Sequence, residues 1–235
     1  NSYSYLEANK KKQKIDLDFN NSFLIKNIFF KYTTKDAYVL DNINLEVKKG
    51  DYIGIYGTSG GGKSTLINIS TGFYAPDYGE IFLENKPITN ITNWKFSTLG
   101  LIRTFQSSRF QSEVILANQL TLSSSISSHA LELCKIAGLK NYIYNFPDEI
   151  PMPALRKAEV IRSMLLNPKV LFLDEPSAGL TTEEIQQFAF FMQQKLSDNV
   201  ALVLVEHRDE MMRILVRDRY YLNNGILKKE EKHLA

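Results

Sequence analysis

The stretch of sequence that decides the fold is Gly57-Thr58-Ser59-Gly60-Gly61-Gly62-Lys63-Ser64-Thr65. It fits the pattern G-x-x-x-x-G-K-[ST], whose glycines let backbone N–H groups turn inward around a polyphosphate. Residues 52–56 before it have the composition of a short buried strand, and residues 65–69 after it can continue as a helix. Because the motif is informative only between a strand and a helix, this context favours a phosphate-binding loop over a glycine-rich turn that binds nothing.

Each part of this loop has a predicted task. Lys63 is expected to reach the β- and γ-phosphates of a nucleotide, and the hydroxyl of Ser64 is expected to bind Mg²⁺. A helix that begins near Lys63 adds the positive end of its dipole to the attraction for phosphate. Residues 57–65 therefore predict a site for a polyphosphate together with Mg²⁺.

The composition sets limits on the class of protein. At 235 residues the chain is long enough for one large α/β domain, or for a core domain with a small inserted one. A net charge of +2 gives no argument for nucleic-acid binding. No run of about 18 apolar residues is present to span a membrane. The single cysteine, Cys134, excludes an internal disulfide and suits a reducing compartment.

Residues 1–21 differ from the rest of the chain. They are polar and lysine-rich, with Lys10, Lys11, Lys12 and Lys14 close together, and are typical of a linker or N-terminal extension. The chain begins at Asn1 rather than Met and shows no signal peptide, which favours a domain excised from a longer protein. The folded domain is expected to span residues 22–235.

The order of strand and helix patterns predicts an α/β fold with two additions. Short strand-like runs lie before and after the P-loop, at 23–25, 28–30, 43–47, 80–83, 87–88 and 99–102, with turns at 48–51 and 75–79. A segment with helical spacing follows at 112–150, and further helices are expected at 154–167 and 182–197. The all-apolar runs 170–173 and 201–205 are typical of central parallel strands, and Asn224-Gly225 predicts a final hairpin.

Polar residues follow several of these apolar runs, where they can converge on the P-loop. Asp174 suits the acidic partner of Mg²⁺, and Glu175 next to it suits a general base that polarises water. His207 can contact the γ-phosphate or orient that water, although a lone histidine after a strand is more often structural. Gln106 can bind Mg²⁺ or water, and by itself is an ordinary loop residue. Tyr32 is either a half-buried strand aromatic or a face on which adenine stacks.

Taken in order along the chain, these motifs resemble the ATP-binding domain of ABC transporters. The resemblance covers residues 23–229, with Tyr32 as the adenine-stacking aromatic, residues 57–65 as Walker A and Gln106 as the Q-loop. Residues 171–176 match Walker B with Glu175 as the catalytic residue, and His207 matches the switch histidine. The resemblance implies an α/β P-loop NTPase with a RecA-like parallel-sheet core, an antiparallel β subdomain and a small helical subdomain at about residues 107–155.

The resemblance also implies cofactors and partners. These are ATP and Mg²⁺, the metal being held by Ser64, Gln106 and Asp174. The implied partners are transmembrane domains, on the same or a separate chain, and a second ATP-binding domain in a head-to-tail dimer at the cytoplasmic face of the membrane. Nucleic acid is not among them.

Two positions depart from the family pattern. The LSGGQ signature should fall at residues 150–154, where the chain reads Ile-Pro-Met-Pro-Ala. In the family this segment offers a serine hydroxyl and backbone N–H groups to the partner's γ-phosphate. Pro151 has no hydroxyl, and neither Pro151 nor Pro153 has an N–H. Thr181 stands where the family usually has Asp, and the stretch between Gln106 and residue 150 is short.

These features leave three functional hypotheses. The leading one is an ATPase domain of an exporter-type transporter, in a heterodimer whose partner supplies a good signature. Residues 174–180 look more like importer ATPases, which leaves the direction of transport open. The second is a regulatory or assembly module with two degenerate signatures that hydrolyses ATP slowly, against which Glu175 and His207 argue. The third, a small-molecule kinase, explains Lys63 and Asp174 but not the other motifs.

Overall fold

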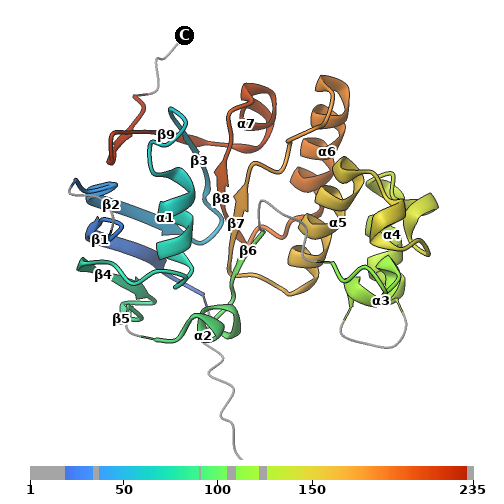
Figure 1. Cartoon of the computed structure of the whole chain (residues 1–235), viewed down its shortest axis with the longest axis horizontal. Helices are drawn as coiled ribbons and strands as arrows, with labels where there is room; N and C mark the ends of the chain where they lie inside the picture. Colours follow the sequence, from blue (N-terminus) through green and yellow to red (C-terminus); the bar gives the residue numbers. More distant parts are fainter. Residues whose placement is uncertain (1–18, 34–36, 90, 105–109, 122–125, 232–235) are drawn as a thin grey trace, which may run out of the picture.

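A computed structural model describes residues 19–33, 37–89, 91–104, 110–121 and 126–231 (Figure 1). The described residues form two β-sheets and a set of helices. The four-stranded antiparallel sheet has the order β2-β1-β4-β5, formed by β1 (Ser22–Phe30), β2 (Leu40–Lys48), β4 (Tyr78–Leu83) and β5 (Lys86–Pro87). The six-stranded sheet has the order β10-β9-β3-β8-β7-β6, formed by β3 (Tyr52–Tyr56), β6 (Leu101–Arg103), β7 (Val170–Asp174), β8 (Ala201–Val205), β9 (Asp218–Asn223) and β10 (Ile226–Lys229).

The helices cover both faces of the six-stranded sheet. They are α1 (Lys63–Ser70), α2 (Asn93–Thr98), α3 (Leu116–Leu120), α4 (Ser128–Ile136), α5 (Met152–Leu165), α6 (Thr182–Lys195), α7 (Asp209–Leu215) and the 3₁₀ turns η1 (Lys140–Tyr142) and η2 (Pro147–Glu149). Figure 1 shows α1 beside the four-stranded sheet and α3 to α6 on the opposite side of the molecule. Within the described ranges, no helix combines the length and apolar character needed to span a bilayer.

The six-stranded sheet is built around parallel strands. β3 pairs in parallel with β8 and β9, and β7 pairs in parallel with β6 and β8, whereas β10 is antiparallel to β9. Every residue of β7 and β8 is buried, as expected for parallel strands with layers on both faces. The prediction of a central parallel sheet is confirmed.

Alternate residues along β7 divide the hydrophobic core into two parts. Leu171 and Leu173 pack with residues of α5, α6 and α7, whereas Val170 and Phe172 pack with α1 and the antiparallel sheet. Phe172 meets the ring of Phe23 from β1 edge to face, with the ring centroids 5.6 Å apart. Successive side chains of a strand point to opposite faces of the sheet, so β7 contributes to both parts of the core. Its residues Val170 and Phe172 pack the parallel sheet against the antiparallel one.

The antiparallel sheet corrects one prediction. The two runs 23–25 and 28–30 belong to one strand, β1, rather than to two. Asn27 has a φ of +50° and the pairing with β2 shifts in register between Ile25 and Ile28. This irregularity turns both isoleucines into the core, so the alternation seen in the sequence is broken within a continuous strand.

The helical region also differs in detail. The helix expected at 154–167 runs from Met152 to Leu165, the one expected at 182–197 ends at Lys195, and the predictions missed α2 and α7. The strand expected at 99–102 is Leu101–Arg103, because Gly100 forms a turn with a φ of +87°. Among the described residues between 107 and 155, the structure has α3, α4, the 3₁₀ turns and the start of α5.

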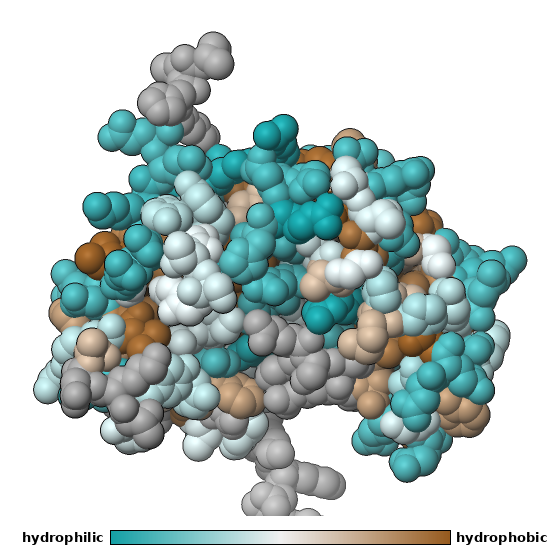
Figure 2. Space-filling view, turned by 45° about the horizontal axis from the view of Figure 1, so that its top comes forward, coloured by the Kyte–Doolittle hydropathy of each residue, from teal (hydrophilic) through white to brown (hydrophobic). Residues whose placement is uncertain are grey.

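The face of the molecule shown in Figure 2 has no large apolar area. On the face shown in Figure 2, most of the exposed residues are hydrophilic and the hydrophobic ones are scattered. The exposed large hydrophobic side chains of the described residues include Tyr78, Tyr144 and Met152, which come from separate parts of the chain. Single residues of this kind are normal on a protein surface.

Candidate functional site

The predicted phosphate-binding loop joins β3 to α1. This is the strand, loop and helix context that the motif requires. Two of its glycines are needed for steric reasons: a Cβ at Gly57 would lie 1.9 Å from the carbonyl oxygen of Leu222, and Gly62 has a φ of +103° with the carbonyl oxygen of Val39 close by. Backbone from β9 and from the residue before β2 therefore encloses the loop from two sides.

Lys63 lies inside this loop. Its ammonium donates hydrogen bonds to the carbonyl oxygens of Gly57, at 3.0 Å, and Thr58, at 2.8 Å. Burial lowers the pKa of Lys63, while the nearby Glu175 and Asp174 act in the opposite direction. The two carbonyls are neutral acceptors, so phosphate oxygens of a bound nucleotide can replace them with charge-assisted hydrogen bonds.

Asp174 ends β7 and is buried, with 2% of its surface exposed. Among the residues that the structure describes, no hydrogen-bond donor reaches either carboxylate oxygen within bonding geometry. Burial raises the pKa of Asp174, and the Ser64 hydroxyl and the Arg103 guanidinium oppose that shift. An unsatisfied carboxylate close to a serine hydroxyl matches the hard oxygen ligands of Mg²⁺, which usually binds one or two carboxylates together with substrate phosphates.

Glu175 and His207 meet where β7 and β8 end. Asp174 pairs with Val205 across the two strands, and the N–H of Glu175 donates to the carbonyl of Val205 at 2.9 Å. The Nε2 of His207 lies 3.1 Å from Oε1 of Glu175. The structure thus brings together two partly exposed residues that lie 32 positions apart in the sequence, and one of them, Glu175, directly follows Asp174.

Tyr32 lies against α1. Its hydroxyl is 2.9 Å from Oγ1 of Thr65, and its half-buried ring meets Phe30 and Tyr74 edge to face. This places the aromatic ring near the P-loop, where a base can stack on it. Gln106 lies outside the described residues, so its predicted role in binding Mg²⁺ or water stays a prediction.

The segment at residues 150–154 leads into α5. Pro151 occupies the N-cap position, and Pro153 lies in the first turn. Ile150 and Ala154 are buried in the core, whereas Pro151 and Met152 are exposed. The exposed part of this helix N-terminus therefore lacks N–H groups at its two prolines.

Thr181 caps α6. Its Oγ1 accepts a hydrogen bond from the N–H of Glu184 at 3.3 Å, and the Glu184 carboxylate accepts one from the N–H of Thr181 at 2.9 Å. This reciprocal pair is a capping box. These hydrogen bonds also lower the pKa of Glu184. Thr181 thus has a clear structural role at the position where Asp was expected.

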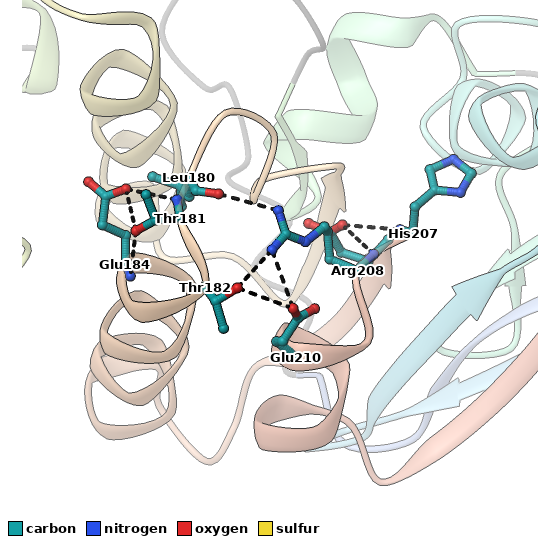
Figure 3. A network of polar contacts seen from close by, with 8 residues as sticks. Leu180, Thr181, Thr182, Glu184, His207, Arg208 and Glu210 are labelled. Atoms are coloured by element: carbon teal, nitrogen blue, oxygen red, sulfur yellow. Dashed lines mark hydrogen bonds and ion pairs between the residues drawn. The ribbon is translucent and has the colours of Figure 1, made fainter.

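No role was predicted for the two residues that flank His207. Glu206 is buried at the end of β8, and Arg208 contacts residues of the loop that follows β7 (Figure 3). The sequence does contain one signal for Glu206, because this charged residue directly follows the five apolar residues 201–205. It becomes informative only when the neighbouring loop is known.

Comparison with known proteins agrees with this geometry. A family model described as ABC transporter matches residues 40–178, more than half of the chain. The chain belongs to the ABC transporter family. This agrees with the resemblance seen in the motifs.

Individual relatives give the same result. The methionine import ATP-binding protein MetN of Bartonella henselae is 30% identical over 213 residues, which cover 84% of this chain and 61% of MetN. The probable branched-chain amino acid transport ATP-binding protein LivG of Methanocaldococcus jannaschii is 27% identical over 207 residues, 79% of this chain and 80% of LivG. This chain therefore spans less than two thirds of the length of MetN.

A solved ATP-binding cassette of an ABC transporter, in its ADP conformation, has the same fold. Its TM-score is 0.75 at 25% identity, and the match covers 90% of this chain and 91% of that cassette. The mixed α/β architecture expected for a P-loop NTPase is therefore confirmed by both the strand order and this match.

Proposed function

We propose that this chain binds ATP with Mg²⁺ at its P-loop, hydrolyses it, and uses the reaction to power a transporter. The observation that carries the proposal is the meeting of Glu175 and His207 at 3.1 Å beside the buried Asp174. A module that only binds nucleotide needs neither a general base nor a histidine next to it. The ADP conformation of the similar cassette supports ATP as the nucleotide.

The residues have distinct roles in this proposal. Lys63 leaves the carbonyls of Gly57 and Thr58 for the phosphates, and residues 57–65 supply backbone donors. Glu175 accepts a proton from the attacking water, and His207 holds the Glu175 carboxylate in place. When bound, Mg²⁺ neutralises charge that develops on the phosphates. Asp174 and Ser64 would hold that ion, Gln106 would join them, and Tyr32 would stack on adenine.

The proposed domain spans residues 22–235, with a helical subdomain at about 107–155. We propose that it forms a head-to-tail dimer with a second ATP-binding domain that carries a good signature. Support comes from Pro151 and Pro153 at the start of α5, because each hydrogen bond lost to a charged phosphate is worth about 1.5–3 kcal/mol. A heterodimer would then have one competent site, formed by the P-loop of this chain and the partner's signature.

The proposed place of action is the cytoplasmic face of a membrane, bound to transmembrane partners. A groove of about 950 Å³ supports such an attachment, because Phe73 and Trp94 line it with exposed rings and Leu166 lies nearby. Arg103 and Arg162 also line it. We propose that a short helix of the transmembrane partner, apolar on one side and acidic at its rim, binds there. Replacing Trp94 by Ala should weaken attachment to the transporter and leave ATP binding unchanged.

The most specific part of the proposal is the direction of transport, which we propose to be export. Its support is the lysine-rich segment with Lys10–Lys12 and Lys14, which resembles the linker that follows the membrane domain of exporters. The importer name of MetN points the other way. ATP-dependent uptake of substrate into inside-out vesicles by the complete transporter would support export, and uptake into right-side-out vesicles would refute it.

Hydrolysis is tested with the chain alone. Phosphate release by the wild type is compared with that of two variants: one carries Leu-Ser-Gly-Gly-Gln at 150–154, and a milder one carries only Pro151→Ser and Pro153→Gly. The milder variant leaves the buried Ile150 and Ala154 intact. We expect low wild-type activity, a gain in at least one variant, and a loss of about 100-fold or more when Glu175→Gln is added. ATP binding without any gain in either variant would refute the catalytic role and favour a regulatory module.

A further inference from the structure

Glu206 holds two loops together through its buried carboxylate. Only 1% of its surface is exposed. Oε1 accepts a hydrogen bond from the N–H of Ser177, in the loop after β7, at 2.8 Å. Oε2 accepts from the N–H groups of His207 and Arg208, at 3.1 Å and 3.4 Å. One carboxylate therefore connects the backbone of the His207 loop to the backbone that directly follows Glu175.

Arg208 makes a second connection between the same two loops (Figure 3). Its Nη1 donates to the carbonyl of Leu180 at 3.4 Å, and its Nη2 donates to Oγ1 of Thr182 at 3.2 Å. Glu210 accepts from the same nitrogen at 3.3 Å. Figure 3 shows the imidazole of His207 pointing away from the Arg208 guanidinium. His207 is thus left free to reach Glu175 while the residues on either side of it are fixed.

We propose that Glu206 and Arg208 are positioning residues that fix the His207 loop to residues 177–182, so that His207 stays within reach of Glu175. Any displacement of residues 177–182, such as one caused by a bound partner domain, would then reach His207 through these bonds. This inference rests on the proposed function for the role of His207 in hydrolysis, but the position of His207 can be measured without activity.

The chemistry of the carboxylate makes the proposal specific. Both oxygens of Glu206 accept, and they face N–H donors from opposite loops. A glutamine of the same size has one carbonyl oxygen, and its NH₂ group would face N–H donors on the other side. Glu206→Gln therefore breaks the connection to one loop while it preserves the volume of the side chain. A buried carboxylate with several donors is costly to disturb because the donors are left unsatisfied.

The test uses the imidazole resonances of the three histidines in the intact chain. His207→Ala assigns the His207 signals, and His129, on α4, is an internal reference. We expect Glu206→Gln to shift or broaden the His207 signals and leave those of His129 in place. Glu159→Gln is the matched control, because Glu159 is also buried but belongs to a different element, α5.

Steady-state kinetics give the second measurement. Where the chain hydrolyses ATP, Glu206→Gln should lower kcat by about tenfold or more and change KM by less than about twofold. Unchanged His207 signals in Glu206→Gln would overturn the proposal, as would a change in these signals or a loss of kcat of the same size in the Glu159→Gln control. If Glu175→Gln has no effect on hydrolysis, the proposed function fails, but the His207 signals still test the positioning role.

Arg208→Ala provides a variant that folds more readily, because the Arg208 side chain is 41% exposed. Its control is Arg213→Ala on α7, which is 75% exposed and pairs with Asp209. Arg208→Ala should move the His207 signals in the same direction as Glu206→Gln and by a smaller amount. Equal spectra for Arg208→Ala, Arg213→Ala and the wild type would remove Arg208 from the proposal.

Discussion

Tyr32 carries two interactions that can be separated by substitution. Its hydroxyl contacts Thr65 on α1 at 2.9 Å, and its ring is the predicted stacking face for adenine. Tyr32→Phe removes only the hydroxyl, whereas Tyr32→Ala also removes the ring. The pair of variants therefore distinguishes a structural aromatic from a nucleotide-binding one.

The expected magnitudes differ between the two variants. Loss of the partly buried hydroxyl hydrogen bond should lower the free energy of unfolding by about 0.5–1.5 kcal/mol, or the melting temperature by about 2–4 °C per kcal/mol in a chain of this size. Nucleotide affinity should stay within about twofold, because the ring remains. Loss of the ring should weaken ATP binding by about 1–3 kcal/mol, which is about 5- to 150-fold.

Calorimetric titration with ATP and with inorganic tripolyphosphate is the assay. Tripolyphosphate has the phosphates but no base, so Tyr32→Ala should weaken ATP binding and leave tripolyphosphate binding close to that of the wild type. Thermal unfolding of the nucleotide-free variants gives the stability term. Wild-type ATP affinity in Tyr32→Ala would refute the stacking role, and an equal loss in Tyr32→Phe would assign the effect to the contact with Thr65.

Three further predictions concern single residues. Asp174→Asn should stabilise the nucleotide-free chain by about 1 kcal/mol, because burial disfavours the charged carboxylate more than the Ser64 hydroxyl and the Arg103 guanidinium favour it, and should abolish the extra stabilisation that Mg²⁺ adds to ATP in thermal unfolding. Burial raises the pKa of the Cys134 thiol to about 11 from 9.0. The folded chain thus keeps this proton longer than the unfolded chain, so the thiol contributes a fall in the free energy of unfolding as the pH rises from 9 toward 11, and Cys134→Ala should make the measured fall smaller. Thr181→Ala should cost about 1 kcal/mol in urea unfolding by removing the N-cap, whereas Thr181→Asp, also a good cap, should cost little.

The sequence predicted those parts of the fold that depend on local patterns. The P-loop, the apolar strands β7 and β8 and the hairpin at Asn224-Gly225 each carry their signal within a few neighbouring residues. The continuity of β1 was missed because Asn27 interrupts the alternation inside the strand. The helices α2 and α7 have only six and seven residues, too short for a clear helical period.

The sequence predicted which residues of the candidate site lie close together where those residues directly follow strands. It did not predict the contacts that form between separate loops. Asp174, Glu175 and His207 were expected to converge because parallel strands end at the same edge of a sheet, and they do. The bonds of Glu206 to Ser177 and of Tyr32 to Thr65 join residues 29 and 33 positions apart. No pattern in the sequence marks such a pair before the adjacent elements are known.

The segment at 150–154 retains a role in the fold despite the loss of the family's signature pattern. Ile150 and Ala154 keep the start of α5 in the core of the helical region, so the segment still supports the fold. The exposed positions between them carry Pro151 and Met152, which offer no donor to a phosphate except the N–H of Met152. The P-loop, Asp174, Glu175 and His207 show no such loss. The proposed heterodimer, with a signature supplied by another domain, would account for both observations, whereas the alternative of two identical degenerate domains would leave the Glu175–His207 pair without a task.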